Sequence, residues 1–279
     1  MTTGDTLIRR LAKRILAPIR STPIYSQIQT WSMSRDIRSG RMQEPELVLL
    51  SSAIKPGETA LDIGANFGLY SYHLSRQVGP AGRVISFEPV PFTCQTLRGV
   101  VKRLGLKNVD IRPVGVGEKP GTLSFTVPLQ KSGQFMAGQA FIGSRNDNHG
   151  DIQGQVRWEN TTQISCPVVI LDDEVKGLST LPFIKIDIEG AEVFAFRGAK
   201  NLISQFHPTI LIEINPWFLD GFQLTMDDLT GPFHALGYKV YRYDESRKKL
   251  DHVTDESKIS EYNYLFIHPD YESRFSEYL

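Results

Sequence analysis

The sequence predicts an α/β protein with an open, mostly parallel sheet and helices on both faces. Short β-rich runs alternate with helical patterns along most of the chain, which is the order that a parallel sheet with crossover helices requires. The chain has 279 residues, of which 41% are apolar, and this is enough for a continuous hydrophobic core. Residues 209–214 are so uniformly apolar that we expect them to form a central strand.

The predicted elements follow one another in a regular order. We expect strands at residues 59–63, 83–87, 109–116, 183–188, 209–214, 238–243 and 262–268. Residues 121–127 alternate with period two, which indicates a hairpin partner or an extension of the sheet edge. We expect helices at 68–78, at 91–104 with a proline in the first turn, from the fourth strand to about residue 204, and at 226–236.

Residues 128–162 interrupt this pattern, because they are rich in Gly, Gln and Asn and have no steady period. A stretch of this length inside a compact domain is usually functional or disordered. Two interpretations stay open, a loop on the substrate side and a mobile surface insertion. We therefore expect two parts of the chain, a basic N-terminal arm at 1–43 and one domain at 44–279 that carries the insertion.

The charge of the chain is unevenly distributed. The 31 Lys and Arg balance the 31 Asp and Glu, which argues against a surface built throughout to bind nucleic acid. Residues 1–41, however, hold eight basic and two acidic side chains, so this segment carries +6 and the rest of the chain −6. Within it, residues 5–20 have the pattern of a short basic amphipathic helix.

Three roles are open for the arm: contact with a membrane surface through residues 5–20, packing on its own domain, or targeting as a transit peptide. No apolar run approaches the roughly 20 residues that a spanning helix needs, and no segment resembles a signal peptide. The two cysteines, Cys94 and Cys166, have no metal-binding or redox spacing, and we expect both to be buried. They suggest a reducing compartment, so we expect a cytoplasmic protein, with attachment at the membrane surface as the variant.

A glycine loop follows the first predicted strand. Residues 62–68 read Asp-Ile-Gly-Ala-Asn-Phe-Gly and lead directly into a helix. Gly64 and Gly68 allow a ligand to approach the backbone, but Asn66 stands where a dinucleotide site has its middle glycine. Asp62, just before the loop, faces a cation or amine better than a phosphate. These features fit a nucleoside cofactor that carries an ammonium group and no phosphate.

Glu88 ends the second predicted strand, in the sequence Phe-Glu-Pro. An acidic residue at this tip can accept hydrogen bonds from both hydroxyls of a ribose. The alternative is an acid that stabilises the start of the next helix.

Several blocks, in order, resemble the FkbM-type S-adenosylmethionine-dependent methyltransferases. They are residues 62–68, Phe-Glu-Pro at 87–89, Leu-Asp-Asp at 171–173, Ile-Lys-Ile-Asp-Ile-Glu-Gly-Ala-Glu at 184–192, Arg-Gly-Ala at 197–199 and Ile-Glu-Ile at 212–214. Glu44-Pro45-Glu46 also resembles a Glu-Pro element of this family. The resemblance covers residues 40–268, apart from the insertion.

The resemblance implies a class I methyltransferase fold, a Rossmann-like sheet of seven strands with the last antiparallel. It also implies O-methylation of a hydroxyl on a sugar, glycan or natural product. Carried over to this sequence, Gly64, Asn66 and Gly68 would wrap the methionine end of S-adenosylmethionine, with Asp62 nearby. Glu88 would hold the ribose hydroxyls, and Asp187 would lie beside the methionine amine and the transferred methyl group.

Three acids, Asp187, Glu189 and Glu192, crowd the tip of the fourth predicted strand, where an open parallel sheet places its ligands. An acid in the first turn stabilises a helix, and this effect can explain the presence of one of the three acids. Carboxylates this close repel one another and need a cationic partner: Lys185, the sulfonium cofactor, or a divalent metal such as Mg²⁺, to which we do not commit. A structural Lys185–Asp187 pair is an alternative, and we expect His207, at the opposite end of the sheet, to be structural.

Methyl transfer to a hydroxyl requires in-line approach and removal of a proton, for which a positioned base contributes about 10²- to 10⁴-fold. The candidate catalytic residues are Asp187, Glu189 and Glu213, with Glu189 or Asp187 as base or metal ligand and Glu213 orienting the substrate. We expect residues 215–217, Asn-Pro-Trp, to form a turn in which Trp217 lines the substrate cleft.

Two other functions stay open. One is methylation of RNA or another nucleic acid through the basic arm, and the other is a non-catalytic cofactor-binding module of the same fold. A nicotinamide dehydrogenase is disfavoured by the missing middle glycine and by Asp62. The acceptor and the oligomeric state are not readable from the sequence.

Overall fold

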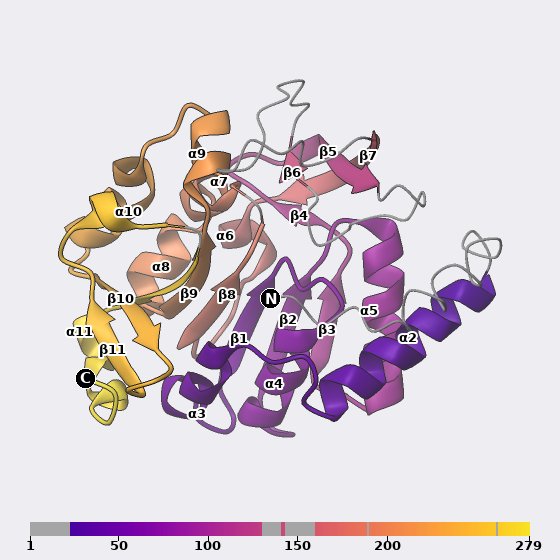
Figure 1. The fold of residues 1–279 in the computed structure, drawn as a ribbon, viewed down its shortest axis with the longest axis horizontal. Coiled ribbons are helices and arrows are strands. Elements are labelled where there is room, and N and C mark those ends of the chain that lie inside the picture. Colours follow the sequence, from indigo (N-terminus) through magenta and orange to yellow (C-terminus); the bar gives the residue numbers. More distant parts are fainter. Residues whose placement is uncertain (1–22, 130–140, 143–159, 189, 261) are drawn as a thin grey trace.

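The computed structural model describes residues 23–129, 141–142, 160–188, 190–260 and 262–279. The main sheet of this described part has eight strands in the order β11-β10-β12-β9-β8-β1-β2-β3 (Figure 1). They are β1 (Thr59–Ile63), β2 (Arg83–Phe87), β3 (Val109–Arg112), β8 (Phe183–Ile186), β9 (Thr209–Ile214), β10 (Lys239–Asp244), β11 (Lys249–His252) and β12 (Tyr262–Ile267). Five neighbouring strands, β3, β2, β1, β8 and β9, run parallel.

The last strand, β12, runs antiparallel to β9 and to β10. The predicted class I order with an antiparallel last strand is therefore confirmed. The predicted number of seven strands is wrong, because β11 adds an eighth at the edge as a hairpin with β10. In β11 only Leu250 is buried, so this short edge strand has no hydrophobic pattern that distinguishes it from a polar loop.

A second, smaller sheet in the described part has the order β4-β7-β5-β6. Its strands are β4 (Gly115–Val116), β5 (Gly121–Leu129), β6 (Phe141–Ile142) and β7 (Asn160–Val169). The predicted strand at 109–116 is therefore two strands in different sheets, with Pro113, which has no N–H to donate, between them. The run at 121–127 is a hairpin partner, paired with β7.

The segment 128–162 is not structureless throughout, because the end of β5, all of β6 and the start of β7 lie within it. Its remaining residues, 130–140 and 143–159, lie outside the described residues. Neither interpretation of this insertion is decided.

Helices cover both faces of the main sheet (Figure 1). The described helices are α2 (Pro23–Arg38), α3 (Leu50–Ala53), α4 (Leu69–Val78), α5 (Pro91–Leu104), α6 (Leu171–Glu174), α7 (Glu192–Arg197), α8 (Lys200–Phe206), α9 (Pro216–Gly221), α10 (Met226–Ala235) and α11 (Pro269–Glu272), with 3-10 turns at Pro45–Leu49, Glu256–Lys258 and Ser273–Phe275. Side chains of α3 and α4 join one buried cluster, and side chains of α7, α8 and α10 join another.

Strand β9 contributes to both clusters, with Ile210 and Ile212 in one and Leu211 in the other. These side chains are almost fully buried, which confirms β9 as a central strand. Both cysteines are free and buried, as the sequence predicts.

Helix α2 packs against α5, although its residues fall within the predicted arm. The two helices cross closely at Gly99, where a Cβ atom would lie 2.6 Å from Cγ2 of Thr30. Ile28 and Trp31 of α2 stay exposed, and the Arg35 guanidinium lies 5.5 Å from the centre of the Trp31 ring. Residues 1–22 lie outside the described residues, so the division at residue 43 stays a prediction.

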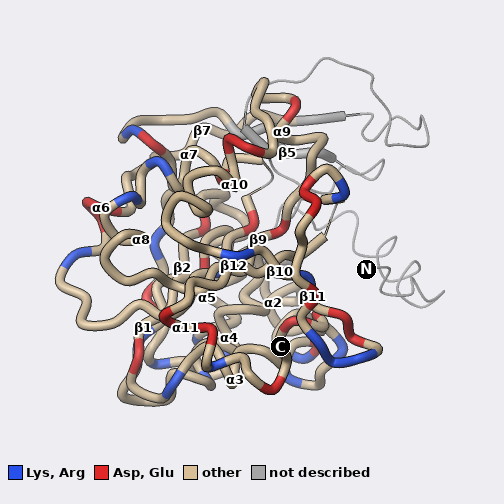
Figure 2. Tube along the Cα trace, turned by 90° about the vertical axis from the view of Figure 1, so that its left-hand side faces the viewer, with Lys and Arg blue, Asp and Glu red and all other residues tan. Residues whose placement is uncertain are grey.

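Acidic and basic positions are interspersed along the described chain on the side shown in Figure 2. The acidic residues of the described chain therefore do not form a single patch on that side.

Candidate active site

The carboxyl ends of β1, β2, β8 and β9 meet at one edge of the main sheet. The loop after β1 has three residues with positive φ, Gly64 (79°), Asn66 (48°) and Gly68 (93°). The N–H groups of Gly64 and Ala65 both donate to the Phe87 carbonyl at 3.0 Å, which fastens the loop to the end of β2. Asn66 thus adopts left-handed backbone geometry, and α4 begins directly after the loop.

Glu88 ties the second strand to this loop. One carboxylate oxygen accepts a hydrogen bond from the Asn66 N–H and the other from the Val90 N–H, each at 2.9 Å. Burial raises the pKa of Glu88 to about 7, even though both hydrogen bonds favour the ionised form. Beside it, the buried Oδ1 atom of Asn66 has no partner among the described residues. Glu88 thus lies at the strand tip and stabilises the turn before α5, and its contact with a ribose stays a prediction.

Asp62 lies beneath the loop and is almost fully buried. It accepts a hydrogen bond from the Ser71 hydroxyl of α4 at 2.5 Å, and Ser71 also lies 2.9 Å from Ser86 of β2. Burial raises the pKa of Asp62 to about 6, against the Ser71 hydrogen bond and the charge of Lys185. The contact with Ser71 is not visible in the sequence, and it gives Asp62 a partner within the protein.

Asp187 follows β8 and lies beside the end of β1, where its N–H donates to the Ile63 carbonyl at 3.0 Å. Its side chain is about one-third exposed, and one oxygen lies 3.9 Å from the ammonium of Lys185, so the predicted pair is present. Glu213 of β9 lies on the neighbouring strand, close enough to Asp187 for the two carboxyl groups to influence each other. Burial and the neighbouring Asp187 raise the pKa of Glu213 to about 7. The structure therefore brings two of the three candidate catalytic carboxylates together.

Two further acids, Glu192 and Glu189, were predicted at the tip of β8. Glu192 folds back on its own turn and accepts hydrogen bonds from the N–H groups of Ile188 (3.1 Å) and Gly190 (3.2 Å). Burial raises its pKa to about 7, and its contacts give it the structural role expected of a first-turn acid. Glu189 lies outside the described residues.

Sequence reasoning missed part of this edge. The Tyr70 hydroxyl of α4 donates to Glu44 at 2.6 Å. The side-chain amide of Asn263, on β12, lies 3.3 Å from Glu44 and 3.4 Å from Glu46. The Glu-Pro element at 44–46 was the signal for this wall of the site, whereas nothing in the sequence pattern marked Tyr70 or Asn263.

The predicted turn at 215–217 is the start of a short helix. Asn215 caps α9, with its side chain accepting a hydrogen bond from the Trp217 N–H at 3.1 Å. Trp217 packs edge-on against Phe218. Its place in a substrate cleft stays a prediction.

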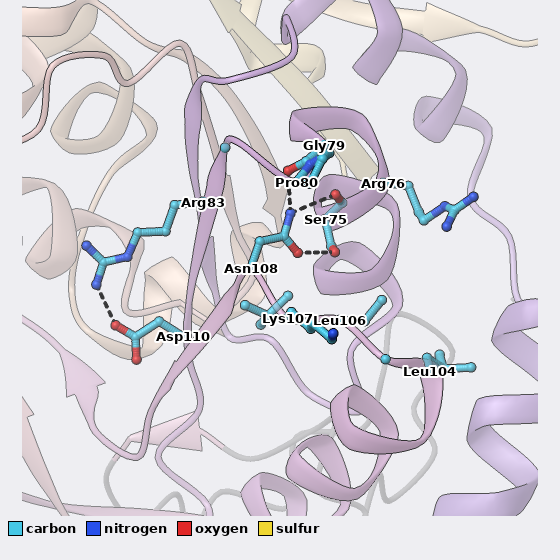
Figure 3. Close-up of a pocket in the computed structure, with 13 residues that line it drawn as sticks. Ser75, Arg76, Gly79, Pro80, Arg83, Leu104, Leu106, Lys107, Asn108 and Asp110 are labelled. Carbon is cyan, nitrogen blue, oxygen red and sulfur yellow. Dashed lines mark hydrogen bonds and ion pairs between the residues drawn. The ribbon is translucent and has the colours of Figure 1, made fainter.

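Two other features lie away from this edge. A groove of about 880 Å³ lies where α4 ends and β2 and β3 begin (Figure 3). There the side chain of Asn108 bonds to Ser75 and to the Gly79 carbonyl, and Arg83 pairs with Asp110 (Figure 3). The contacts of Asn108 hold α4 against the sheet, and the Arg83–Asp110 pair joins β2 to β3. The groove lies at the opposite end of the strands from the candidate site.

The described residues contain one group of three side chains that could hold a metal ion: His207, His268 and Asp270. His207 precedes β9, at the far end of that strand, as expected. Its ring stacks on His268 at 3.9 Å, and its Nδ1 lies 2.8 Å from Asp270. Both rings have partners in the protein, which agrees with a structural role.

The comparisons with known proteins find methyltransferases. The model of the methyltransferase FkbM domain matches residues 62–240. The chain is 26% identical over 163 residues to Methyltransferase 1 of Beauveria bassiana (strain ARSEF 2860), covering 55% of this chain and 63% of that protein. It is 24% identical over 175 residues to Methyltransferase sdnD of Sordaria araneosa, covering 55% and 64%. These matches span less than two-thirds of each relative.

Among solved structures, the chain is similar to Methyltransferase FkbM from Methylobacillus flagellatus KT. The identity is 18%, the TM-score is 0.43, and the match covers 94% of this chain and 60% of that chain. The class I fold is shown by the strand order of the main sheet and by the matched family. Because the family model covers more than half of the sequence, this chain belongs to the FkbM family of S-adenosylmethionine-dependent methyltransferases.

Proposed function

We propose that this protein transfers the methyl group of S-adenosylmethionine to a hydroxyl of a sugar, a glycan or a natural product. The observation that carries the proposal is the pair of neighbouring carboxyl groups, Asp187 and Glu213, beside the glycine loop. A carboxyl group whose pKa is about 7 can take up and release a proton near neutral pH, which suits a general base for a hydroxyl.

The loop after β1 fits the methionine part of this cofactor. Positive φ at Gly64 and Gly68 lets a ligand approach the backbone, and the buried Oδ1 of Asn66 offers an unused hydrogen-bond acceptor. Glu88 would hold the ribose hydroxyls, because each of its oxygens keeps a free lone pair after accepting one backbone N–H. Asp62 would act from beneath the loop, through its charge, and Asp187 would face the methionine amine.

When bound, the cofactor supplies an activated methyl group. The protein's own part is then to orient the acceptor hydroxyl in line with that group and to accept its proton. We propose that the Asp187–Glu213 pair accepts this proton and that Glu213 also orients the acceptor. Glu189 is a second proposed base, from its sequence position alone.

Metal dependence stays open in this proposal. At the candidate site, the described side chains do not form a group of three metal-binding residues, and Asp187 is already paired with Lys185. The proposal therefore routes no step through a metal.

Equilibrium binding of S-adenosylmethionine, compared with binding of NAD, tests the cofactor. Incubation with hydroxylated metabolites, glycans and RNA, with detection of the demethylated cofactor product, then tests the acceptor. Methylated sugar or metabolite hydroxyls would support the proposal. Transfer to RNA alone would replace it with the nucleic-acid alternative, and tight cofactor binding without turnover on any acceptor class would favour the non-catalytic module.

The variants Asp187→Asn, Glu213→Gln and Glu189→Gln separate cofactor binding from chemistry. A base should lose at least about 10²-fold in turnover while its cofactor affinity changes little. A variant that loses cofactor affinity in proportion to its activity would move that residue to the cofactor site.

We also propose a cytoplasmic protein whose arm, through residues 5–20, contacts an anionic membrane surface. None of the helices in the described parts of the chain combines the length and apolar character needed to cross a bilayer. Support comes from α2, the next helix along the chain, where Trp31 and Ile28 are exposed beside Arg35 and Arg38. Deleting residues 1–20 should abolish sedimentation with phosphatidylglycerol vesicles, and unchanged sedimentation would reject this contact.

A further inference from the structure

Lys185 is a buried lysine in the middle of the main sheet, with only about 2% of its surface exposed. Its Nζ lies 3.4 Å from the Ile186 carbonyl, 3.4 Å from the side-chain oxygen of Asn263, and 3.9 Å from the Asp187 carboxylate. The ring of Tyr70 covers it at 5.2 Å. A buried ammonium is costly unless it is paired, so these contacts call for an explanation.

The strand register explains how Lys185 reaches these groups. It is paired in register with Asp62 of β1, and it stands two residues before Asp187, so the three side chains lie on one face of the sheet. Glu213 and Asn263 are paired across β9 and β12, on the other side of β8. Adjacent strands thus place one cation among acids that come from separate parts of the sequence.

The acids around this lysine outnumber it. Asp187, Glu44, Glu213 and Asp62 all act on its charge, and Glu46 is influenced by it in turn. Burial alone would lower the pKa of Lys185, but the four carboxylates outweigh burial and raise it above its usual value. The ammonium is therefore charged at every pH at which the carboxylates titrate.

The contacts of Glu44 and Asn263 fix the position of the lysine. Tyr70 donates its hydroxyl to Glu44 and places its ring over the ammonium, while Asn263 accepts from Lys185 and offers its amide to Glu44 and Glu46. Three segments remote in sequence thus hold one charge in place. A lysine with only a packing role would not require this number of directed contacts with polar and aromatic groups.

We propose that Lys185 is the positioning residue of the Asp187–Glu213 pair: its ammonium, held 3.9 Å from Asp187, keeps a negative charge on the pair and directs it at the acceptor. The role of Lys185 in catalysis rests on the proposed function. In that reaction the acceptor O–H bond breaks and its proton passes to the ionised carboxylate. The acceptor oxygen bonds to the methyl carbon as the carbon–sulfur bond breaks, and the sulfur keeps the electron pair as a neutral thioether.

The direct test is a carboxyl titration of the full chain by NMR, with ¹³C-labelled Asp and Glu, in the absence of cofactor. Because the two carboxylates interact, their midpoints belong to the pair. Loss of an opposite charge at this distance should raise the upper midpoint in Lys185→Met by about 1 unit or more. A change below about 0.3 units would overturn the proposal.

The matched control is Lys239→Met. Lys239 is a half-exposed lysine of β10 that pairs with Glu272 at 2.9 Å, so this variant also removes one paired ammonium. It should leave the titration of the pair unchanged. An equal shift in both variants would show that net charge, and not the position of Lys185, sets the ionisation of the pair, and would also overturn the proposal.

Once an acceptor is known, the pH profile separates positioning from a merely structural role. In Lys185→Met, the pH at which kcat rises should increase by the same number of pH units as the midpoint of the carboxyl titration. The KM for the cofactor should change less than kcat. A uniform loss of kcat at all pH values would contradict positioning.

A measurement on the unaltered chain covers the case in which Lys185→Met does not fold. The ¹⁵N signal of the Lys185 ammonium should stay that of the charged form at pH 10, and a neutral Lys185 at pH 8 would overturn the proposal. Neither titration uses the cofactor. Failure of S-adenosylmethionine to bind would therefore refute the proposed function, while the role of Lys185 would still be decided.

Discussion

Gly64 lies directly against Asp187: a Cβ atom on Gly64 would fall 1.9 Å from the Asp187 carbonyl oxygen. The tips of β1 and β8 are thus in backbone contact, and the hydrogen bond from the Asp187 N–H to the Ile63 carbonyl holds them there. The loop proposed to hold the cofactor and the carboxylate proposed as base are therefore set relative to each other by main-chain geometry.

Gly64→Ala should unfold the loop or displace Asp187, because it adds a clash to the cost of a positive φ. Gly57→Ala is the matched control, since Gly57 also has positive φ (90°) but has nothing within 4 Å of the added Cβ. We expect the control to lose about 1 kcal/mol of unfolding free energy and to bind cofactor normally. Gly64→Ala should lose more and bind cofactor at least 10-fold more weakly. Equal losses in both variants, measured by urea unfolding and calorimetry, would contradict the close contact.

Glu88→Gln should weaken both the loop and the cofactor site. An amide group has one oxygen, so one of the two N–H groups, that of Asn66 or of Val90, would face an NH₂ group instead of an acceptor. We expect a loss of about 1 to 3 kcal/mol in unfolding free energy and a clear loss of cofactor affinity. Glu118→Gln, at a partly exposed acid that pairs with Arg197, is the control and should change neither quantity by much. Wild-type affinity in Glu88→Gln would remove Glu88 from the cofactor site.

Asp62 should make the stability of the protein depend on pH. Burial raises its pKa from 3.8 to about 6 in the folded protein, so the folded state binds this proton more tightly than the unfolded chain. The resulting stabilisation is complete below pH 3.8 and is lost as the pH rises through 6. Asp62→Asn keeps an oxygen for the Ser71 hydroxyl but cannot ionise.

Relative to wild type, Asp62→Asn should therefore gain stability between pH 4 and pH 7, on the order of 2 kcal/mol. Urea unfolding at several pH values measures this difference. A difference that is constant over the range would show that Asp62 titrates normally in the folded protein.

Asp172→Ala should reduce stability without affecting the site. Both carboxylate oxygens of Asp172 accept N–H groups at the start of α8, from Asn201 (3.0 Å) and Leu202 (2.9 Å). Loss of such a cap costs about 0.5 to 2 kcal/mol. The Leu-Asp-Asp block at 171–173 is thus explained by helix capping, and cofactor affinity should match that of the wild type. Weaker cofactor binding would place this block in the site.

The sequence predicted best those elements whose pattern is local. Strands β1, β2 and β9 and helix α5 have the predicted bounds, because each is an apolar run or amphipathic segment limited by Gly, Pro or polar residues. The predicted helix up to residue 204 is instead two, α7 and α8. The break falls at Gly198, where a Cβ would lie 2.1 Å from the Gly117 carbonyl oxygen, a contact with a distant loop.

Elements that depend on distant partners were not predicted. Helix α2 has few apolar residues and is held by its contact with Gly99 of α5, which its own periodicity does not reveal. Strand β7 was not predicted at all, and only its first three residues overlap the polar insertion. Its pairing partner, β5, lies some 40 positions away along the chain, so the pairing is not visible in the local pattern.

The same distinction between local patterns and distant contacts applies to the candidate site. Asp62, Glu88, Asp187 and Glu213 could be proposed because each ends a recognisable strand. Lys185 could also be named as a partner of Asp187, but the partners that come from distant elements could not. Ser71 reaches Asp62 from a helix, and Asn263 reaches Glu44 across 219 positions of sequence.

The place of β12 in the sheet also bears on how the protein is made. β12 is the last strand in the chain, yet it lies inside the main sheet, between β9 and β10. A nascent chain that has not yet released residues 262–267 therefore has two unpaired strand edges in the middle of its sheet. Such edges can pair with other chains, so a premature stop before residue 262 would produce an aggregation-prone fragment instead of a slightly smaller enzyme.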